Sequence, residues 1–329
     1  MIANFRNWLI SNFRLQVAPV DEFWAPFEKE IDSFDSLVKV INEISAKVEK
    51  KEIQFAWRGQ VDSCWALHSS LYRRTLLTKG SPLLESDFIK EEHKVLKEFH
   101  RWGLHSSIQT GRLSILNQLA MLQHYGAPTR LIDITFNVWI GVWFAVEKKW
   151  LNGDVAYEDK DARLFAIDVT KRLINENEWR IWEDDLHRPW GDKSSKAIDS
   201  RQWTTSVFSW RPPNLNSRIA AQNGGFLFGG VVGSQKPNRG TFQFPKEPGN
   251  GNWSIQEGRS ACCLAIRPHK FDTLRGGASS GALYTFRIKA KAKPEIRRKL
   301  EKIFGYQHLT IYPDYTGFAA YGTPHFKQY

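Results

Sequence analysis

The chain has 329 residues, in which 46 Lys and Arg residues outnumber 35 Asp and Glu residues and give a formal net charge of +11. Hydrophobic residues make up 42% and charged residues 25% of the chain, which is enough to build a core and excludes collagen-like, fully disordered and membrane-embedded proteins. This length predicts one large domain or two smaller ones.

The first predicted element is a helix over residues 26–51, where apolar side chains recur at spacings of three and four. Ser33 or Asp35 is expected to cap its second half. Residues 53–57 alternate large apolar side chains with small or polar ones, which predicts a strand. This strand is expected to run into a glycine turn at Arg58-Gly59-Gln60, so that Arg58 lies at the strand end.

The middle of the chain predicts three helices, over residues 85–104, 113–123 and 138–149, of which the third is almost wholly apolar. Residues 123–135 join the second helix to the third through a Gly and Pro turn and a short strand. Polar side chains next to such a buried helix are expected to line a pocket.

Alternation along the short strand assigns its side chains to two faces. Thr129, Asp133 and Thr135 are expected on one face, and Arg130 on the other. We therefore expect Arg130 to have a structural role rather than to contact a ligand.

The last third of the chain predicts strands over residues 163–169, 261–268 and 283–289, and a helix over residues 294–304 with proline in its first turn. Residues 229–258 are rich in Gly, Pro, Asn and Ser and predict a long loop or insertion.

Strands and helices are mixed without a regular strand-helix-strand repeat, which favours an α+β fold. The predicted organisation is an N-terminal helical segment over residues 1–50 followed by one domain over residues 51–329.

The cysteines and the hydropathy of the chain indicate its cellular compartment. The adjacent Cys262 and Cys263 lie in an apolar run and are expected to be buried thiols of a reducing compartment. The first twenty residues contain Arg6 and Arg14 and no continuous apolar run, so they do not resemble a signal peptide. The longest uncharged apolar stretch is too short to span a bilayer, which needs about 20 residues. We expect a cytoplasmic protein with no membrane association.

Three separated segments resemble the FRG domain, a bacterial family named after its aromatic-Arg-Gly signature. They are residues 55–60, residues 123–135 with 144–147, and residues 218–226, and residues 303–317 resemble the ending of the same family. Ile134 stands where the family commonly has tryptophan, and residues 229–258 are longer than usual. The family is known mainly from bacterial defence and toxin-like contexts, so the resemblance implies such a context here.

The aromatic-Arg-Gly strand is also similar to the first strand of ADP-ribosyltransferases of the Arg-Ser-Glu type, in which the arginine holds the phosphates of NAD. This likeness implies a mixed, mostly antiparallel split sheet with flanking helices and NAD as a substrate. It departs at the catalytic glutamate, where this chain offers Gln222, an amide that cannot neutralise developing positive charge. Glu147 or Glu257 substitutes for it, or the site binds a nucleotide without cleaving it.

The candidate site follows from these resemblances and from the residue types. The predicted NAD-binding residues are Arg58, Gly59, Gln60, Tyr125, Thr129 and Thr135, and the predicted catalytic residues are His124, Asp133 and Gln222. A guanidinium suits a diphosphate, and an imidazole suits acid-base work near neutral pH. The structural alternatives are that Arg58 pairs with a carboxylate such as Asp133, and that His124 bonds a loop carbonyl. No metal site is predicted.

The leading hypothesis is an NAD-using, ADP-ribosyltransferase-like toxin or effector of a bacterial anti-phage defence or toxin-antitoxin system. It would transfer ADP-ribose to a protein or nucleic acid, or hydrolyse NAD, and an antitoxin or defence-system partner is expected. The alternatives are a nucleic-acid-binding protein or metal-independent nuclease whose basic surface includes Arg73, Arg74 and residues 287–302, and a purely structural interaction module.

Overall fold

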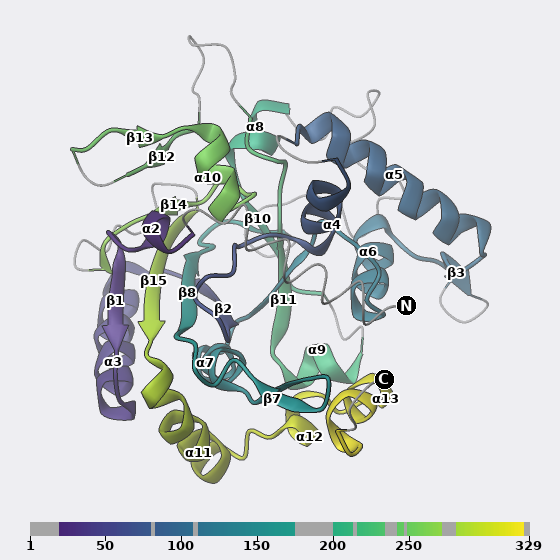
Figure 1. The fold of residues 1–329 in the computed structure, drawn as a ribbon. Coiled ribbons are helices and arrows are strands. Elements are labelled where there is room, and N and C mark those ends of the chain that lie inside the picture. Colours follow the sequence, from purple (N-terminus) through teal and green to yellow (C-terminus); the bar gives the residue numbers. More distant parts are fainter. Residues whose placement is uncertain are drawn as a thin grey trace.

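The computed structural model describes residues 20–79, 83–107, 111–174, 200–212, 216–233, 242–246, 249–271 and 281–325. Within these residues, nine strands form one sheet in the order β1-β15-β8-β2-β5-β11-β10-β9, with β14 beside β15 (Figure 1). The strands are β1 (Glu28–Ile31), β15 (Ala282–Ile288), β8 (Ala162–Asp168), β2 (Phe55–Gln60), β5 (Ile132–Thr135), β11 (Gly224–Phe228), β10 (Phe208–Trp210), β9 (Leu173–Ile174) and β14 (Arg267–Pro268).

Most of the strand pairs are antiparallel. The run from β15 through β8, β2, β5 and β11 to β10 is antiparallel throughout, whereas β1 and β14 pair with β15, and β9 with β10, in parallel. The expected mixed and mostly antiparallel sheet with flanking helices is therefore confirmed.

Helices and short hairpins surround the sheet. The helices are α2 (Val20–Trp24), α3 (Phe34–Lys51), α4 (Ser70–Lys79), α5 (Glu85–Arg101), α6 (Ile115–His124), α7 (Val138–Val146), α8 (Ser200–Thr205), α9 (Ser217–Ala221), α10 (Ile255–Ala261), α11 (Lys293–Phe304), α12 (His308–Ile311) and α13 (Tyr315–Gly317). The hairpins are β3 (Ser106–Ser107) with β4 (Gly111–Arg112), β6 (Lys149–Leu151) with β7 (Asp154–Ala156), and β12 (Phe244–Pro245) with β13 (Asn252–Trp253).

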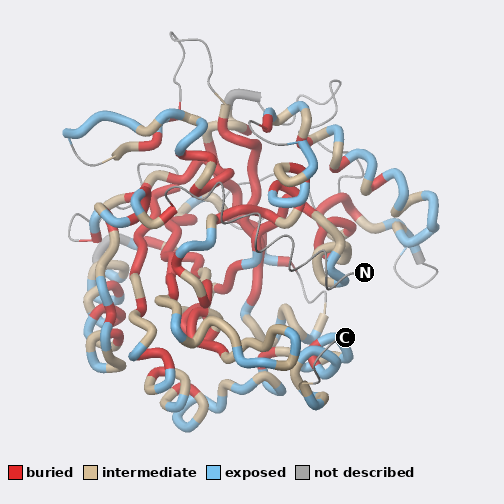
Figure 2. The backbone as a smooth tube through the Cα atoms, in the orientation of Figure 1, coloured by how far each residue is buried: buried red, intermediate tan, exposed pale blue. Residues whose placement is uncertain are grey.

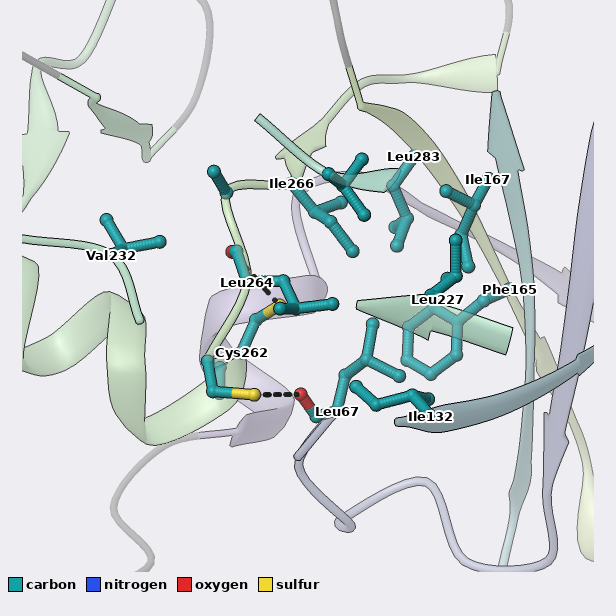
Figure 3. Close-up of a cluster of buried hydrophobic side chains, with 14 of the residues drawn as sticks. Leu67, Ile132, Phe165, Ile167, Leu227, Val232, Cys262, Leu264, Ile266 and Leu283 are labelled. Carbon is teal, nitrogen blue, oxygen red and sulfur yellow. Dashed lines mark hydrogen bonds between the residues drawn. The ribbon is translucent and has the colours of Figure 1, made fainter. Parts of the chain in front are cut away.

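The sheet has a hydrophobic core on each face, so its strands are buried along their centres (Figure 2). On one face, α3, α7 and α11 pack against side chains such as Trp57 and Phe286. On the other face, α2, α4 and the segment around Cys262 pack against Ile132 and Phe165 (Figure 3). A third cluster joins α5 and α6 to β10 and β11. Cys262 and Cys263 are buried free thiols, as expected.

The N-terminal helix prediction is correct only in part. Residues 28–31 form β1, which pairs with β15 at an edge of the sheet, and α3 begins only after them. Ser33 caps α3, because its hydroxyl accepts the backbone N–H of Ser36 and the Ser36 hydroxyl accepts the N–H of Ser33. Residues 20–51 thus contribute a strand and a helix to the same sheet and core as the rest of the chain.

Other predicted elements agree with the structure to within a few residues, namely α5, α6, β5, α7, β8, β15 and α11. The strand predicted over residues 261–268 is wrong for its first part, where α10 ends and only a single bridge joins Leu67 to Cys262. In the predicted insertion 229–258, residues 234–241 and 247–248 lie outside the described residues, and the remainder includes a short hairpin and the start of α10. No described helix is long and apolar enough to cross a membrane.

Candidate functional site

The candidate site lies where β2 and β5 diverge. These neighbouring strands share a single register pair, Trp57 with Thr135, and beyond it Arg58 reaches across the gap. Arg58 Nη1 donates to the backbone oxygen of Asp133 at 2.6 Å. Its Nε is buried and has no hydrogen-bond partner among the described residues. The sheet therefore opens at the arginine of the aromatic-Arg-Gly signature.

The register of β2 corrects the predicted turn at residues 58–60. The strand continues through Gln60, so Arg58 lies inside it rather than at its end. Gly59 faces α7, and a Cβ there would lie 2.1 Å from Gly141 O and 2.4 Å from Ala145 N. This glycine lets a helix, rather than a ligand, approach the strand. The buried Gln60 side chain donates to Ala66 O at 3.3 Å, across the strand from α7.

A second arginine stands beside Arg58. Arg73 on α4 donates to the backbone oxygen of His68 at 2.7 Å, and its neighbour Arg74 donates to Gly126 O at 3.0 Å. Burial lowers the pKa of the half-buried Arg58. Arg73 is an exposed residue, although desolvation of its guanidinium, together with the positive charge of Arg58, lowers its pKa. Within the described part of the chain neither Arg58 nor Arg73 forms an ion pair, although the Asp133 carboxylate is close enough to raise both pKa values against these effects. The pair is a concentration of positive charge.

Gln123, the penultimate residue of α6, connects the polar groups around this gap. Its Oε1 accepts from the hydroxyl of the buried Thr129 at 2.6 Å and from Ser70 at 3.4 Å. Its Nε2 donates to Asp133 Oδ2 at 3.2 Å. Thr129 and Asp133 thus meet on one side, as alternation predicts, although only Asp133 belongs to β5.

His124 belongs to a second group of charges next to the first. Its Nε2 lies 3.9 Å from Asp314 Oδ2, and Arg218 on α9 donates to Asp314 Oδ1 at 2.5 Å. Burial and the charge of Arg218 lower the pKa of His124, so its imidazole is neutral near pH 7. Burial alone would raise the pKa of Asp314, but hydrogen bonds from Arg218 and from the Gly317 N–H lower it to about 2. Asp133 acts on His124 as well, and so connects the two groups electrostatically.

The sequence alone does not indicate Arg218 and Asp314 as site residues. Arg218 lies in a segment that resembles the FRG domain, but nothing in that segment assigns this arginine a role. Asp314 lies 96 residues away, in the last turns of the chain. The signal that was present is the Pro-Asp-Tyr-Thr-Gly run, in which an aspartate three residues before a glycine is typical of a capped turn. Asp314 is the N-cap of α13.

The side chains of Gln222 and Thr135 form hydrogen bonds with the backbone. Gln222 is the C-cap of α9 rather than a strand residue, and its Nε2 donates to Ile311 O at 3.0 Å. The buried Thr135 hydroxyl donates to Gln222 O at 2.7 Å and accepts the Asn137 N–H. Both side chains therefore have structural partners. Tyr125, in contrast, is exposed and packs edge-on against the His124 ring.

The two glutamates that could replace a catalytic glutamate are both engaged. Glu147 is buried, accepts from the Tyr312 hydroxyl at 2.8 Å and pairs with Lys149 at 2.6 Å. Glu257 lies in the first turn of α10, where it forms a capping box with Ser254. Neither contacts Arg58 or His124.

Arg130 has the structural role expected of it. Its guanidinium is fully buried and binds both carboxylate oxygens of Glu92, at 2.5 and 3.0 Å. It also donates to Glu85 at 3.2 Å and to Gly229 O at 3.0 Å, and so connects the segment just before β5 to α5.

Several basic side chains over residues 287–302 have partners within the protein. Arg287 pairs with Glu28 and Asp21, and Arg297 binds Glu158 through both of its terminal nitrogens. Lys293 is buried, and its ammonium donates to three backbone oxygens, those of Val61, Tyr157 and Lys160. The stretch therefore exposes fewer free cations than its sequence suggests, and nucleic-acid binding there stays a prediction. Among the described residues no cluster of His, Cys, Asp and Glu could hold a metal ion.

Comparison with known families addresses the origin of this arrangement. Residues 53–152 match the family model of the FRG domain. The chain contains an FRG domain. The match includes β2, with its aromatic-Arg-Gly signature, and the α6 to α7 region with Gln123, His124 and Asp133. The segment with Arg218 and the C-terminal residues with Asp314 lie outside it. No curated protein and no solved structure matches the chain.

Proposed function

We propose that this FRG-domain protein binds NAD at the gap between β2 and β5 and uses it as a substrate. The observation that carries the proposal is the pair of guanidinium groups on Arg58 and Arg73. Two like charges held together in a partly buried site destabilise each other, and a bound anion relieves that repulsion. The diphosphate of NAD supplies two negative charges, and guanidinium groups bind phosphate oxygens through paired hydrogen bonds.

The chemistry proposed is the breaking of the glycosidic bond of NAD. The bond between C1′ of the ribose and the nicotinamide nitrogen breaks, and its electron pair leaves with nicotinamide. An oxygen or nitrogen atom of a macromolecule, or of water, bonds to C1′ and loses a proton. The neutral imidazole of His124 is suited to accept that proton. The Asp133 carboxylate, which is exposed beside Arg58, is suited to stabilise the positive charge that develops on the ribose.

This assignment gives Asp133 the electrostatic role that the amide of Gln222 cannot have. Gln222 instead holds the C-terminal segment beside His124 through Ile311 O. The cellular setting that we propose, a toxic effector of a bacterial defence or toxin-antitoxin system, rests on the contexts of the FRG family and not on the site.

The test is calorimetric titration of the full chain with NAD, together with mass spectrometry for released nicotinamide. We expect binding with release, and a loss of affinity of about tenfold or more in Arg58→Lys, because lysine keeps the charge but not the two-pronged geometry. Arg101→Lys is the matched control, since Arg101 is an exposed arginine of α5 with only a surface partner. An absence of NAD binding by the folded protein would refute the proposal, and steeply salt-dependent binding of an oligonucleotide would then favour the nucleic-acid alternative.

A further inference from the structure

The two oxygens of the Asp314 carboxylate have different surroundings. Oδ1 accepts from Arg218 Nη2 at 2.5 Å, from the Thr316 hydroxyl at 2.8 Å and from the Gly317 N–H at 2.7 Å. Oδ2 is buried and has no hydrogen-bond partner among the described residues. Oδ1 alone therefore accounts for the ion pair and for the helix cap. A buried carboxylate oxygen without a donor is costly, so its position needs a separate explanation.

The imidazole of His124 lies next to this oxygen. His124 Nε2 is 3.9 Å from Asp314 Oδ2. Within the described part of the chain, neither ring nitrogen of His124 forms a hydrogen bond. The separation exceeds a hydrogen bond by about 1 Å, and catalytic hydrogen bonds are often long in unliganded sites and tighten when the substrate binds. The helices α9 and α13 lie together next to α6, which ends at His124 (Figure 1).

The charges of this group favour one arrangement of protons. Burial opposes ionisation of Asp314, but hydrogen bonds from Arg218 and Gly317 lower its pKa to about 2, so Oδ2 only accepts. Burial and the charge of Arg218 lower the pKa of His124 more than the charges of Asp314 and Asp133 raise it. Near neutral pH the ring therefore carries one proton, on either Nδ1 or Nε2. An ionised carboxylate beside Nε2 stabilises the form with the proton on Nε2.

We propose that Asp314 is a positioning residue of the NAD reaction, which keeps the proton of His124 on Nε2 and so leaves the lone pair of Nδ1 as the base. This role rests on the proposed function, in which His124 accepts a proton from the acceptor. The O–H or N–H bond of the acceptor breaks as its oxygen or nitrogen bonds to C1′, and the proton moves to Nδ1. The imidazolium that forms donates from Nε2 to Asp314 Oδ2, and the carboxylate offsets its positive charge.

The first measurement is the tautomer of His124, without NAD. The full chain is labelled with nitrogen-15 at its histidines, and proton–nitrogen correlation spectra distinguish a ring protonated on Nε2 from one protonated on Nδ1. The signals of His124 are those that disappear in His124→Gln. At a pH where the ring is neutral, we expect the proton on Nε2 in the original chain.

The second measurement uses Asp314→Asn. The three donors to Oδ1 hold the amide oxygen in that place, so the amide N–H replaces Oδ2 and faces Nε2 of His124. The ring proton should then shift to Nδ1, and nicotinamide release should fall by at least about a hundredfold while the affinity for NAD is unchanged.

Asp87→Asn is the matched control for this variant. Asp87 also accepts from a cation, Lys79, and from a backbone N–H, that of Leu84. A purely structural effect of replacing a carboxylate by an amide would therefore occur in both proteins. We expect Asp87→Asn to leave the tautomer of His124 and the rate of nicotinamide release unchanged.

A proton on Nδ1 in the original chain would overturn the proposal, and this result does not depend on whether any variant of Asp314 folds. An Asp314→Asn protein that releases nicotinamide as fast as the original chain would also overturn it. If the original chain releases no nicotinamide, the proposed function fails and the catalytic part of this proposal fails with it. The tautomer spectra are recorded without NAD, so they still decide whether Asp314 positions the His124 ring.

Discussion

The closest contact between β2 and α7 predicts a large effect for a small substitution, Gly59→Ala. The added Cβ would lie 2.1 Å from Gly141 O, 2.4 Å from Ala145 N and 2.9 Å from Phe144 C, where about 3.5 Å is a normal approach. All three atoms belong to the backbone of α7, so no side-chain rotation relieves the overlap, and the helix has to move away from the strand by roughly 1 Å.

This displacement disturbs a helix whose Val142, Trp143 and Ala145 are fully buried. Overpacking that shifts backbone lies at the upper end of the usual range, so we expect a loss of about 3 kcal/mol in the free energy of unfolding. The assay is urea unfolding followed by tryptophan fluorescence. Gly224→Ala is the control, because this glycine is also in a strand, its nearest neighbours would be 3.4 Å or more away, and a change within about 1 kcal/mol is expected.

A Gly59→Ala protein as stable as the original chain would refute this reasoning. If such a protein also lost affinity for NAD, Gly59 would be a residue that admits a ligand, as its sequence context suggested. Loss of stability with the NAD affinity of the remaining folded fraction preserved is the result that the packing predicts.

Two further predictions concern buried titratable groups. Glu92→Gln removes the carboxylate that binds the buried guanidinium of Arg130 and should lower the free energy of unfolding by about 3 kcal/mol in the same urea assay. Glu91→Gln is the control on the same helix. It removes the surface partner of Lys94 and should change the free energy of unfolding by less than about 1 kcal/mol. Burial lowers the pKa of His68 from its ordinary value of 6.5 to about 4. Between these two pH values the unfolded chain binds a proton at this histidine and the folded chain does not. The free energy of unfolding should therefore fall by about 3 kcal/mol as the pH is lowered from 7 to 4. That decline should be shallower in His68→Gln, and equal slopes for the two proteins in pH-dependent urea unfolding would contradict it.

Much of the fold could be predicted because its elements bury one face and follow a clear period. Helices α5, α7 and α11 and strands β8 and β15 are of this kind. β1 was missed because Phe27, Ile31 and Phe34 continue the spacing of the helix that follows, and the charged residues of this edge strand do not alternate with apolar ones. Tertiary pairing with β15 decides its conformation.

The candidate site could be predicted only in part from the sequence. Arg58, Gln123 and Asp133 lie in short recognisable segments, and the structure brings them together at the gap between β2 and β5. The pattern around Gly59 does not distinguish a glycine that admits a ligand from one that admits a helix. The partnership of Arg218 with Asp314 joins segments 96 residues apart, and no local pattern links them.

The central claim is that Arg58 and Arg73 are held together for an anionic ligand, and urea unfolding of the original chain and of Arg73→Ala, each with and without NAD, tests it most directly. NAD should raise the free energy of unfolding of the original chain, and Arg73→Ala should lose this response. The variant's own stability without NAD is expected to fall, because the hydrogen bond from Arg73 to His68 O is lost. An Arg73→Ala protein that NAD stabilises as much as the original chain would contradict this claim about Arg58 and Arg73. An original chain that NAD does not stabilise at all would also contradict it.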